Sequence, residues 1–411
     1  MKRRALLAGT AAALITSVPS SFLPRAAQAQ PAHRHRNATL PPQCPHDCNL
    51  VAALQAHVDL ITRVNTCRRP FRHAGPRIEA EKLGEKLIIH NYGHGGSGWS
   101  LCWGSSRQAL GLAQAASSGN VDSMAVAGCG PLGLSAALLA QRAGISVRIY
   151  AKALPPTIAS LGATGLWSPD SRFCASDYGD DWTRAWNDMA NFSFQEHSQA
   201  IAQPGMSVEW FNGYRLSHNS LRDDDRSFEA LPYAMDEPRY AKFASTFLPP
   251  SVELPPGSHP FPLPHARCFT GMMFNLPLYA QALMDEFLAR GGRIEIREFR
   301  SLGELAALPE NVVINATGYG ARALVGDESV IPVRGQTVRL SVQPAVRYAL
   351  RSGRFLVMPR RDGILVQNVA ETGGFNNADD TPDRAGAEAI VRELQAVTDG
   401  MRCASTHRAG R

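Results

Sequence analysis

Val126-Ala-Gly-Cys-Gly-Pro-Leu-Gly-Leu-Ser135 is the stretch of this sequence that decides the fold. It overlaps the short apolar run Met124–Ala127, which predicts a buried strand, and it leads into a helical pattern. Gly128 permits a tight turn, Gly130 lets the backbone approach a pyrophosphate, and Gly133 lets the helix pack closely on the strand. The N-terminus of that helix would face the phosphate charge. The stretch therefore predicts a strand, turn and helix that bind a dinucleotide.

The patterns that follow extend this unit to a βαβ crossover. Leu134–Ala143 has helical spacing, and Val147–Tyr150 is typical of the next strand. Many such units end their second strand in Asp or Glu to hold a ribose, whereas this one ends in Tyr150-Ala-Lys152. The missing acidic residue disfavours NAD as the dinucleotide.

A second glycine-rich stretch, Ile88-Ile-His-Asn-Tyr-Gly-His-Gly-Gly-Ser-Gly-Trp-Ser100, precedes the first. Residues Gly93–Gly98 carry little side-chain bulk, so backbone amides and carbonyls there could grip a flat ring. The alternative is a glycine-rich hairpin without a ligand. We expect both stretches to lie against one bound dinucleotide, because the turn at Gly128 supplies an independent site for the same molecule.

The remaining patterns predict an α/β chain with a second, antiparallel part. Residues 176–264 are rich in aromatic, Asp and Pro residues, and we expect them to be irregular and to supply a lid. Helices are predicted over Asn49–Thr62, Leu101–Ala116, Leu278–Arg290 and Arg384–Thr398, and strands over Lys86–His90, Arg293–Arg297, Val312–Gly318, Arg334–Leu340 and Arg354–Val357.

A chain of 411 residues is long enough for two lobes that share an interface, and we expect two. The predicted divisions are a signal peptide over 1–29, a linker and helix over 30–65, a dinucleotide-binding lobe over 66–175 and 293–340, and a substrate and lid lobe with a tail over 176–292 and 341–411.

Residues 1–29 are predicted to form an export signal. Lys2-Arg3-Arg4 precedes the apolar run Ala5–Val18, and Ala27-Gln28-Ala29 suits a cleavage site. Pro19 interrupts the run too early for a membrane span. The adjacent arginines suit the twin-arginine route, and general secretion is the alternative. We expect a periplasmic or secreted protein.

The charge of the chain is modest for its length. A formal net charge of +6 results from 42 basic and 36 acidic residues, with no dense basic block interleaved with aromatics. We therefore expect no nucleic-acid partner. No later stretch is long and apolar enough to cross a bilayer, so we also expect no membrane span.

Eight cysteines in an exported chain raise the question of disulfides. Cys44 and Cys48 could form a local bridge, could bind a metal together with His46, or could be free thiols. The ligands are too few for zinc, and we predict no metal. Four other cysteines lie in apolar surroundings and are expected to be small core residues: Cys102, Cys129, Cys174 and Cys268.

With these stretches in view, the sequence resembles the D-amino-acid oxidase family of FAD enzymes over about Thr66 to Phe355. The segment His90-Asn-Tyr-Gly-His-Gly-Gly-Ser-Gly-Trp99 is the most specific part, since it is close to the family's C-terminal signature. The other matching pieces are the Gly128 turn, Ala163-Thr-Gly-Leu-Trp-Ser-Pro169, Gly213-Tyr-Arg-Leu216, Tyr279–Leu283, Ile314-Asn-Ala-Thr-Gly318, Val333-Arg-Gly-Gln336, Arg69-Pro-Phe-Arg72 and Pro76-Arg-Ile-Glu79.

The order of these pieces differs from the family's order. There the glycine turn opens the chain and the His-Asn-Tyr-Gly-His-Gly-Gly piece closes it, whereas here the closing piece comes first. A circular permutation would explain this, with Ser117–Ser123 as the polar linker between the family's ends. The alternative is a fusion or truncation that leaves a defective enzyme.

The resemblance implies an FAD-binding Rossmann-like domain and an antiparallel-sheet substrate domain. It places the glycine loop beside the flavin ring, with Ser100 over the pyrimidine edge. The cofactor-binding residues it implies are Gly95, Gly96, Ser97, Gly98, Ser100, Gly128, Gly130, Gly133, Leu134, Ser135, Ala163, Gly165, Leu166, Trp167 and Gly318.

The resemblance also implies how a substrate amino acid is held. Arg69 would form a bidentate pair with its carboxylate, with Arg68 and Arg72 close enough to compete, and a surface arginine is the alternative. The carbonyl of Gly96 would accept a hydrogen bond from the substrate amine. Hydride transfer from Cα to flavin N5 then depends on orientation and needs no strong base.

The resemblance leaves the substrate's side chain open. His265 stands where the family has an active-site tyrosine, and it or Arg267 could pair with an acidic side chain such as that of D-aspartate. A solvated pair on the lid is the alternative. The implied activity is oxidation of a D-amino acid to the imino acid, with oxygen reoxidising the flavin to give hydrogen peroxide. Glycine or N-methyl amino acids as substrates, a non-catalytic flavin protein, and a homodimer stay open.

Overall fold

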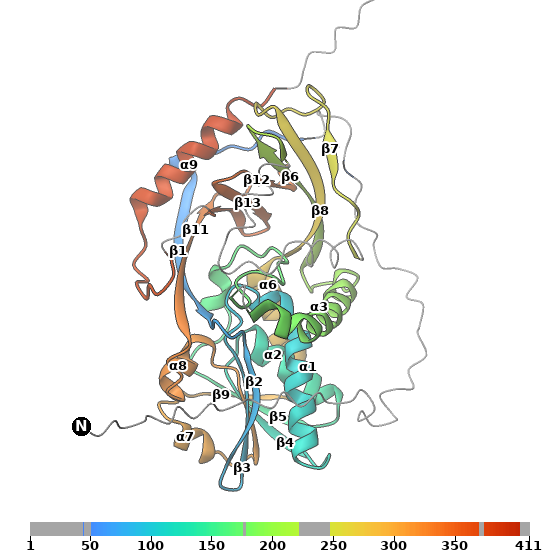
Figure 1. Cartoon of the computed structure of the whole chain (residues 1–411), viewed down its shortest axis with the longest axis vertical. Coiled ribbons are helices and arrows are strands. Elements are labelled where there is room, and N and C mark those ends of the chain that lie inside the picture. Colours follow the sequence, from blue (N-terminus) through green and yellow to red (C-terminus); the bar gives the residue numbers. More distant parts are fainter. Residues whose placement is uncertain (1–43, 45–50, 176–177, 222–246, 370–373, 403–411) are drawn as a thin grey trace, which may run out of the picture. The chain divides into compact units, whose positions relative to one another are not determined.

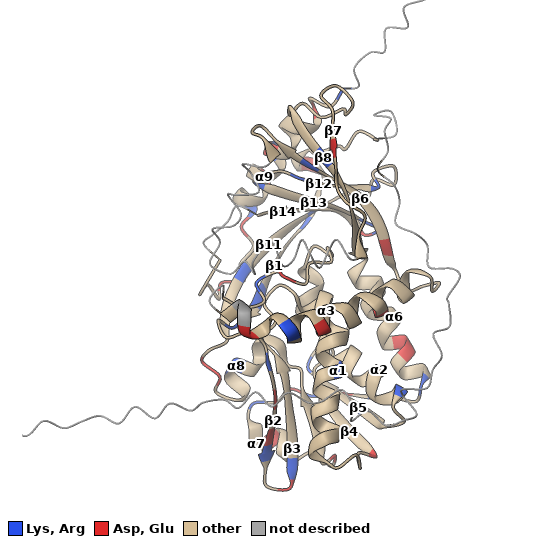
Figure 2. Cartoon of the chain, turned by 45° about the vertical axis from the view of Figure 1, so that its right-hand side comes forward, with Lys and Arg blue, Asp and Glu red and all other residues tan. Residues whose placement is uncertain are grey.

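Two sheets organise the computed structural model, which describes residues 44, 51–175, 178–221, 247–369 and 374–402. All of these residues belong to one compact unit, Asn37–Arg411. Within the described residues, no helix is long and apolar enough to span a membrane. Basic and acidic positions are interspersed along the ribbon of both sheets (Figure 2).

The six-stranded sheet carries the predicted βαβ unit. Its strands lie in the order β2-β3-β10-β4-β5-β9, and all neighbours are parallel except β2 and β3 (Figure 1). The carboxyl ends of its parallel strands therefore meet at one edge, where ligands bind in open α/β sheets. The strands are β2 (Arg77–Leu83), β3 (Lys86–Tyr92), β4 (Ser123–Ala127), β5 (Ser146–Ala151), β9 (Arg293–Ile296) and β10 (Val312–Asn315).

Helices cover both faces of this sheet because its strands are apolar on both sides. Val126 and Ile314 point into the core formed with α1 (Gly98–Ala116), α2 (Pro131–Arg142), α3 (Gly179–Ile201) and α6 (Leu276–Ala289). Their neighbours Ala127 and Val313 point the opposite way. There they pack with residues of α7 (Leu302–Ala306) and α8 (Ala321–Leu324).

The eight-stranded sheet has the order β1-β11-β14-β13-β12-β6-β8-β7, and of its pairs only β12 and β6 are parallel. The helix α9 (Arg384–Thr398) packs on one face, and Leu166 packs on the other. The strands are β1 (Ile61–Phe71), β6 (Val208–Ser217), β7 (Val252–Leu254), β8 (His265–Phe274), β11 (Ile331–Leu340), β12 (Tyr348–Arg351), β13 (Phe355–Arg360) and β14 (Gly363–Asn368).

Most predicted elements are present, and the α/β fold class with an antiparallel second sheet is confirmed. The helix predicted over Asn49–Thr62 is wrong: within its described part there is only a 3₁₀ turn, Val58–Leu60, before β1 begins. A second error is the segment expected to be irregular from residue 176, because α3 occupies 179–201. The predicted lid falls partly on residues 222–246, which lie outside the described residues.

The boundaries of the predicted lobes differ from the sheets at two strands. Residues 66–71 and 331–340 were assigned to the dinucleotide-binding lobe, yet β1 and β11 pair with each other in the eight-stranded sheet. The pairing has a physical cause, because ten residue pairs in antiparallel register satisfy the backbone of both strands. Sequence proximity to the glycine loop therefore misplaced β1.

A disulfide joins Cys44 to Cys268, which corrects two predictions about cysteine. Cys44 does not pair with Cys48, which lies outside the described residues, and Cys268 is not a free core residue. Cys102, Cys129 and Cys174 are buried and lie outside the disulfide, as predicted for small core residues.

Candidate functional site

The glycine turn after β4 leaves open space at its second glycine only. Gly128 has φ +114°, and a methyl group there would lie 2.4 Å from the carbonyl oxygen of Ala316. A methyl group at Gly133 would lie 2.0 Å from the carbonyl oxygen of Gly128. At Gly130, the N-cap of α2, a methyl group would meet nothing within 4 Å. The first and third glycines are thus fixed by packing, and the second leaves room before the helix N-terminus.

The glycine loop between β3 and α1 is held from both sides. The amide of Gly95 donates to the carbonyl of Pro70 at 2.8 Å, and the amide of Gly96 donates to the carbonyl of Ser171 at 2.9 Å. Ser97 N–H donates back to the His94 carbonyl at 3.0 Å. These three amides are therefore occupied, and a ligand beside the loop would meet its carbonyls and the first N–H groups of α1.

Two polar acceptor atoms of this loop have no hydrogen-bond partner among the described residues. The Gly96 carbonyl accepts no hydrogen bond from the described residues. The buried Nδ1 of His94 also lacks a partner there. Its Nε2 lies 2.7 Å from Ser105 Oγ, which donates to Asn91 Oδ1, so Nε2 carries the proton and Nδ1 is an acceptor. Burial lowers the pKa of His94 to about 3, which keeps the ring neutral.

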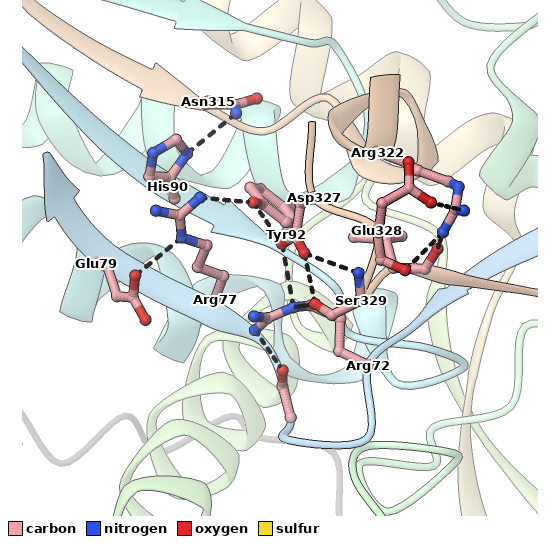
Figure 3. A network of polar contacts seen from close by, with 12 residues as sticks. Arg72, Arg77, Glu79, His90, Tyr92, Asn315, Arg322, Asp327, Glu328 and Ser329 are labelled. Carbon is pink, nitrogen blue, oxygen red and sulfur yellow. Dashed lines mark hydrogen bonds and ion pairs between the residues drawn. The ribbon is translucent and has the colours of Figure 1, made fainter. Parts of the chain in front are cut away.

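Behind the loop, His90 joins β3 to β10 (Figure 3). Asn315 Nδ2 donates to His90 Nδ1 at 3.2 Å, so the His90 proton is on Nε2, 2.9 Å from Glu81. Burial lowers the pKa of His90 despite that carboxylate. Asn315 Oδ1 also accepts a hydrogen bond from the Thr317 hydroxyl at 2.7 Å. This contact fixes the chain that leads to Gly318.

Asp327 is the centre of a second group of contacts in Figure 3. Tyr92 OH donates to it at 2.8 Å, and Arg72 forms an ion pair with it at 3.3 Å. Burial alone would raise its pKa, but hydrogen bonds from Ser329 and Tyr92 and the charge of Arg72 hold that pKa below its usual value. A charged Asp327 therefore anchors the last residue of β3, directly before Gly93.

Of the three arginines near the end of β1, Arg69 alone has no carboxylate within 4.0 Å among the described residues. Arg68 pairs with Asp380 at 3.0 Å and lies over the ring of Tyr319. Arg72 is occupied by Asp327. Arg69 donates only to the carbonyl of Arg334, at 3.2 Å, and its neighbour Pro70 holds the glycine loop.

The segment Ala163–Trp167, which follows β5 in the chain, pairs with the end of β8. Gly165 has φ +89°, and its carbonyl accepts from the Phe274 amide at 2.7 Å. Trp167 N–H donates to Met272 at 2.9 Å, so Leu166 is directed onto the eight-stranded sheet. Sequence reasoning missed Arg360, which is 2% exposed and donates to the Ala163 carbonyl at 2.8 Å. The sequence pattern that could have indicated Arg360 is the charged turn Arg360-Arg361-Asp362-Gly363, which lies between two apolar strands.

Four predicted site residues have other neighbours in the structure. His265 begins β8, opposite Ser217 and eight residues before the Met273 that faces Leu166, and its catalytic role stays a prediction. Leu134 and Ser135 are fully buried, and the Ser135 hydroxyl donates to Pro131 at 2.8 Å within the α1–α2 interface. The Ser100 hydroxyl accepts from Ser168 N–H at 2.8 Å, which ties α1 to the segment after β5.

A parallel sheet with a glycine turn before a helix, joined to an antiparallel sheet that presents an arginine beside a glycine loop, defines a dinucleotide-dependent oxidoreductase. The family described as DAO, FAD dependent oxidoreductase, matches residues 123–410, which is more than half of the chain. The chain belongs to this family, and FAD is its cofactor, as predicted.

Individual relatives agree with the family. A D-amino-acid oxidase of Rubrobacter xylanophilus is 30% identical over 292 residues, which are 69% of this chain and 80% of that protein. A D-aspartate oxidase of Homo sapiens is 28% identical over 137 residues, 33% of this chain and 39% of that protein. Among solved structures, iminodiacetate oxidase from Chelativorans sp. BNC1 is 16% identical with a TM-score of 0.49, over 67% of this chain and 79% of that one.

The residues present fit FAD. Gly98, Gly130 and Gly318 each leave open space where a methyl group would stand, and each lies at a helix start or strand end of the six-stranded sheet. Gly130 and the α2 N-terminus would hold the pyrophosphate, and the loop up to Gly98 would lie beside the flavin.

Proposed function

We propose that this enzyme oxidises a D-amino acid to the imino acid, which water then hydrolyses to a 2-oxo acid and ammonia. When bound, FAD supplies the acceptor for a hydride from Cα, and oxygen returns it to the oxidised state with release of hydrogen peroxide. The proposal depends most on one observation: Arg69, near the end of β1, has no carboxylate partner among the described residues. Similarity to D-amino-acid oxidases supports the choice of substrate.

Arg69 would bind the substrate carboxylate and Gly96 would orient the amine. A guanidinium offers two parallel N–H donors that match a carboxylate. The open carbonyl of Gly96 can accept from a neutral amine, which fixes the face of Cα that meets the flavin. Both groups lie on the two segments joined by the Pro70–Gly95 hydrogen bond, so their spacing is set by the main chain.

The test replaces Arg69 and measures peroxide with a panel of D- and L-amino acids. We expect Arg69→Ala to lower kcat/KM by an amount equivalent to about 2 to 5 kcal/mol of transition-state stabilisation, because one partner of a desolvated pair is lost. The flavin spectrum should be unchanged. Arg68→Ala is the matched control, since its partner Asp380 is an exposed carboxylate. Equal losses in both variants, or turnover of L-amino acids only, would contradict the proposal.

A dicarboxylic D-amino acid is the second candidate substrate. Arg351, Arg215 and Arg267 stand opposite one another across β12, β6 and β8. By strand alternation they share the face of Phe211, on which Leu166 packs. Burial raises the pKa of Asp170, and the charge of Arg351 acts against that rise. Similarity to a D-aspartate oxidase also supports this candidate.

The ratio of kcat/KM for D-aspartate over D-alanine separates the two candidates. Arg351→Met should lower that ratio by an amount equivalent to about 1.5 to 3 kcal/mol, which is the usual contribution of a hydrogen bond to a charged group. Arg347→Met, at an exposed position before the same strand, is the control. A ratio that stays the same in Arg351→Met would remove the dicarboxylic substrate.

We also propose that the chain is a circular permutant of its family. The family match begins at Ser123, yet β3, which precedes it, lies inside the six-stranded sheet between β2 and β10. The Tyr348 hydroxyl donates to Ala52 at 2.8 Å and lies 3.9 Å from Met401 Sδ, so both described ends of the unit meet there. Neighbouring ends are what a permutation requires.

Reordering the gene tests the permutation. A chain that starts at Ser123, runs to Arg402 and continues with residues 51–116 restores the family order. We expect it to bind FAD and to turn over the same substrate, because every strand pair can re-form. A restored chain that folds without flavin would favour a fusion with a disabled site.

Export is proposed on chemical grounds. The Cys44–Cys268 disulfide needs an oxidising compartment, which suits the signal-like residues 1–29. Fractionation with N-terminal sequencing tests this, and uncleaved protein in the cytosol would contradict it.

A further inference from the structure

We propose that Gly335 is a positioning residue that seats the guanidinium of Arg69 for the carboxylate of the substrate. The proposal rests on the proposed function of Arg69 and assigns a second residue to the same site. Gly335 belongs to β11, and the register pairs it with Cys67 while Arg69 is opposite Val333. Gly335 is therefore the diagonal neighbour of Arg69 across the two strands, within reach of a long side chain.

The guanidinium of Arg69 fills the space where a side chain of Gly335 would stand. A methyl group at Gly335 would stand 2.2 Å from each terminal nitrogen of Arg69 and 2.3 Å from its Cζ. An in-plane point equally far from both nitrogens would lie farther from Cζ than this, so the methyl position is out of the guanidinium plane, above its two terminal nitrogens. The missing side chain of Gly335 is thus the space that the guanidinium fills.

This seat leaves the edge of the guanidinium for a ligand. All N–H groups of arginine lie in the guanidinium plane, so a contact on its face uses none of them. One terminal nitrogen donates to the Arg334 carbonyl at 3.2 Å, and no carboxylate of the described residues is within 4.0 Å. The face contact and the hydrogen bond together fix the plane in which a bidentate pair can form.

The backbone at residue 335 does not itself require glycine. Gly335 is not among the glycines with positive φ, so an alanine can adopt its conformation within the strand. The three atoms nearest to an added methyl group all belong to the guanidinium of Arg69. Because that group ends a flexible side chain, the fold can keep its shape while Arg69 turns away.

The experiment compares Gly335→Ala, Arg69→Ala and the double variant in the FAD-loaded enzyme. We expect Gly335→Ala to raise the KM for D-alanine on the order of 10²-fold, because the carboxylate clamp is misplaced by about 1 Å or more. The dissociation constant of propionate, a carboxylate without an amine, should rise equally when its binding is followed by thermal shift. The flavin content and the melting temperature without ligand should stay near those of the parent protein. Gly353→Ala, which meets nothing within 4 Å, is the control.

The double variant decides whether the effect passes through Arg69. If it does, Gly335→Ala changes nothing further once Arg69 is alanine. A further loss in that background, or unchanged KM and propionate binding in the single variant, overturns the proposal. Should Gly335→Ala fail to fold, recovery of folding in the double variant supports it and continued failure overturns it.

The same measurements separate this proposal from the proposed function. If the parent protein oxidises no D-amino acid, while Gly335→Ala and Arg69→Ala both weaken propionate binding, the proposed function is wrong and the positioning role of Gly335 is supported. If Arg69→Ala binds propionate like the parent protein, both fail.

Discussion

The two sheets use glycine in different ways. In the six-stranded sheet, a methyl group at Gly128 would strike the carbonyl of Ala316, and one at Gly133 would strike the carbonyl of Gly128. Both obstacles are main chain. The main chain there cannot give way unless β4, β10 or α2 moves, so the dinucleotide half is fixed by backbone geometry.

In β6 and β8 of the eight-stranded sheet the obstacles are side chains, whereas at Gly363 of β14 the nearest atom is again a main-chain oxygen, that of Leu340 at 2.5 Å. A methyl group at Gly213 would meet the ring of Phe269 at 2.3 Å, and one at Gly271 would meet the ring of Phe211 at 2.5 Å. Rings can turn about their χ angles, whereas carbonyls in a sheet cannot. The comparison teaches that the glycine turn of the cofactor half tolerates few changes, while β6 and β8 of the substrate half can be reshaped by repacking.

The largest effect is expected at Gly128. Gly128→Val adds a β-branched side chain at φ +114° and against a carbonyl, so we expect about 4 kcal/mol or more of lost stability. Chemical denaturation of the apoprotein measures this. A fully folded variant that still binds FAD would break the comparison between the two sheets.

Next comes Gly130→Val, which should separate folding from cofactor binding. A Cβ atom there meets no protein atom within 4 Å, so the denaturation midpoint of the apoprotein should stay near that of the parent. The same side chain occupies the approach to the pyrophosphate, and the purified variant should be colourless. Retained yellow colour would count against the assignment of the turn.

A smaller effect on folding stability is expected as the pH is lowered. Burial lowers the pKa values of His94 and His197 to about 3, against 6.5 for the free side chain. The unfolded chain therefore binds more protons below pH 6.5, and the stability present above that pH is lost as pH falls towards 3. Each histidine gives a slope of up to about 1.4 kcal/mol per pH unit.

His197→Gln tests the acid prediction. His197 lies in α3, with Tyr279 OH at 3.2 Å and the Trp99 carbonyl at 3.2 Å. The variant should be less stable at pH 7 and should show a flatter loss between pH 6 and 4. An unchanged slope in denaturation at several pH values would show that this ring is not the titrating group.

The smallest effect is expected at Gly271. Gly271→Ala presses on the ring of Phe211, which can turn, so we expect about 1 to 2 kcal/mol of lost stability with FAD retained. Thermal denaturation of the holoenzyme measures it. A loss as large as that of Gly128→Val would erase the distinction between backbone and side-chain obstacles.

The sequence predicted best where local rules are sufficient. The helix α9 begins at Arg384 and ends at Thr398 as predicted, because Asp383 caps an amphipathic pattern. The predicted glycine turn is present, with a positive φ at Gly128 and open space at Gly130. Each feature depends on residues within one turn of helix or one loop.

Prediction failed where distant residues decide the structure. Residues 49–62 show helical spacing, but β1 pairs with β11, and Ile61 is opposite Leu340, 279 residues away in the chain. The partner of Cys44 is 224 residues away, and Arg360 reaches Ala163 across 197 residues. No local pattern encodes such contacts, because they depend on how the strands are ordered in the sheet.

The disulfide between Cys44 and Cys268 has a mechanical consequence. In the sheet order, β1 and β8 are separated by β11, β14, β13, β12 and β6, yet the chain that enters β1 is covalently fastened to β8. Force applied to the amino end is therefore delivered to an inner strand near the opposite edge, and β1 is spared. An unfolding motor that pulls from the amino end therefore reaches the Cys44–Cys268 disulfide before it reaches β1. β1 can be separated from β11 by that pull only after the disulfide is reduced.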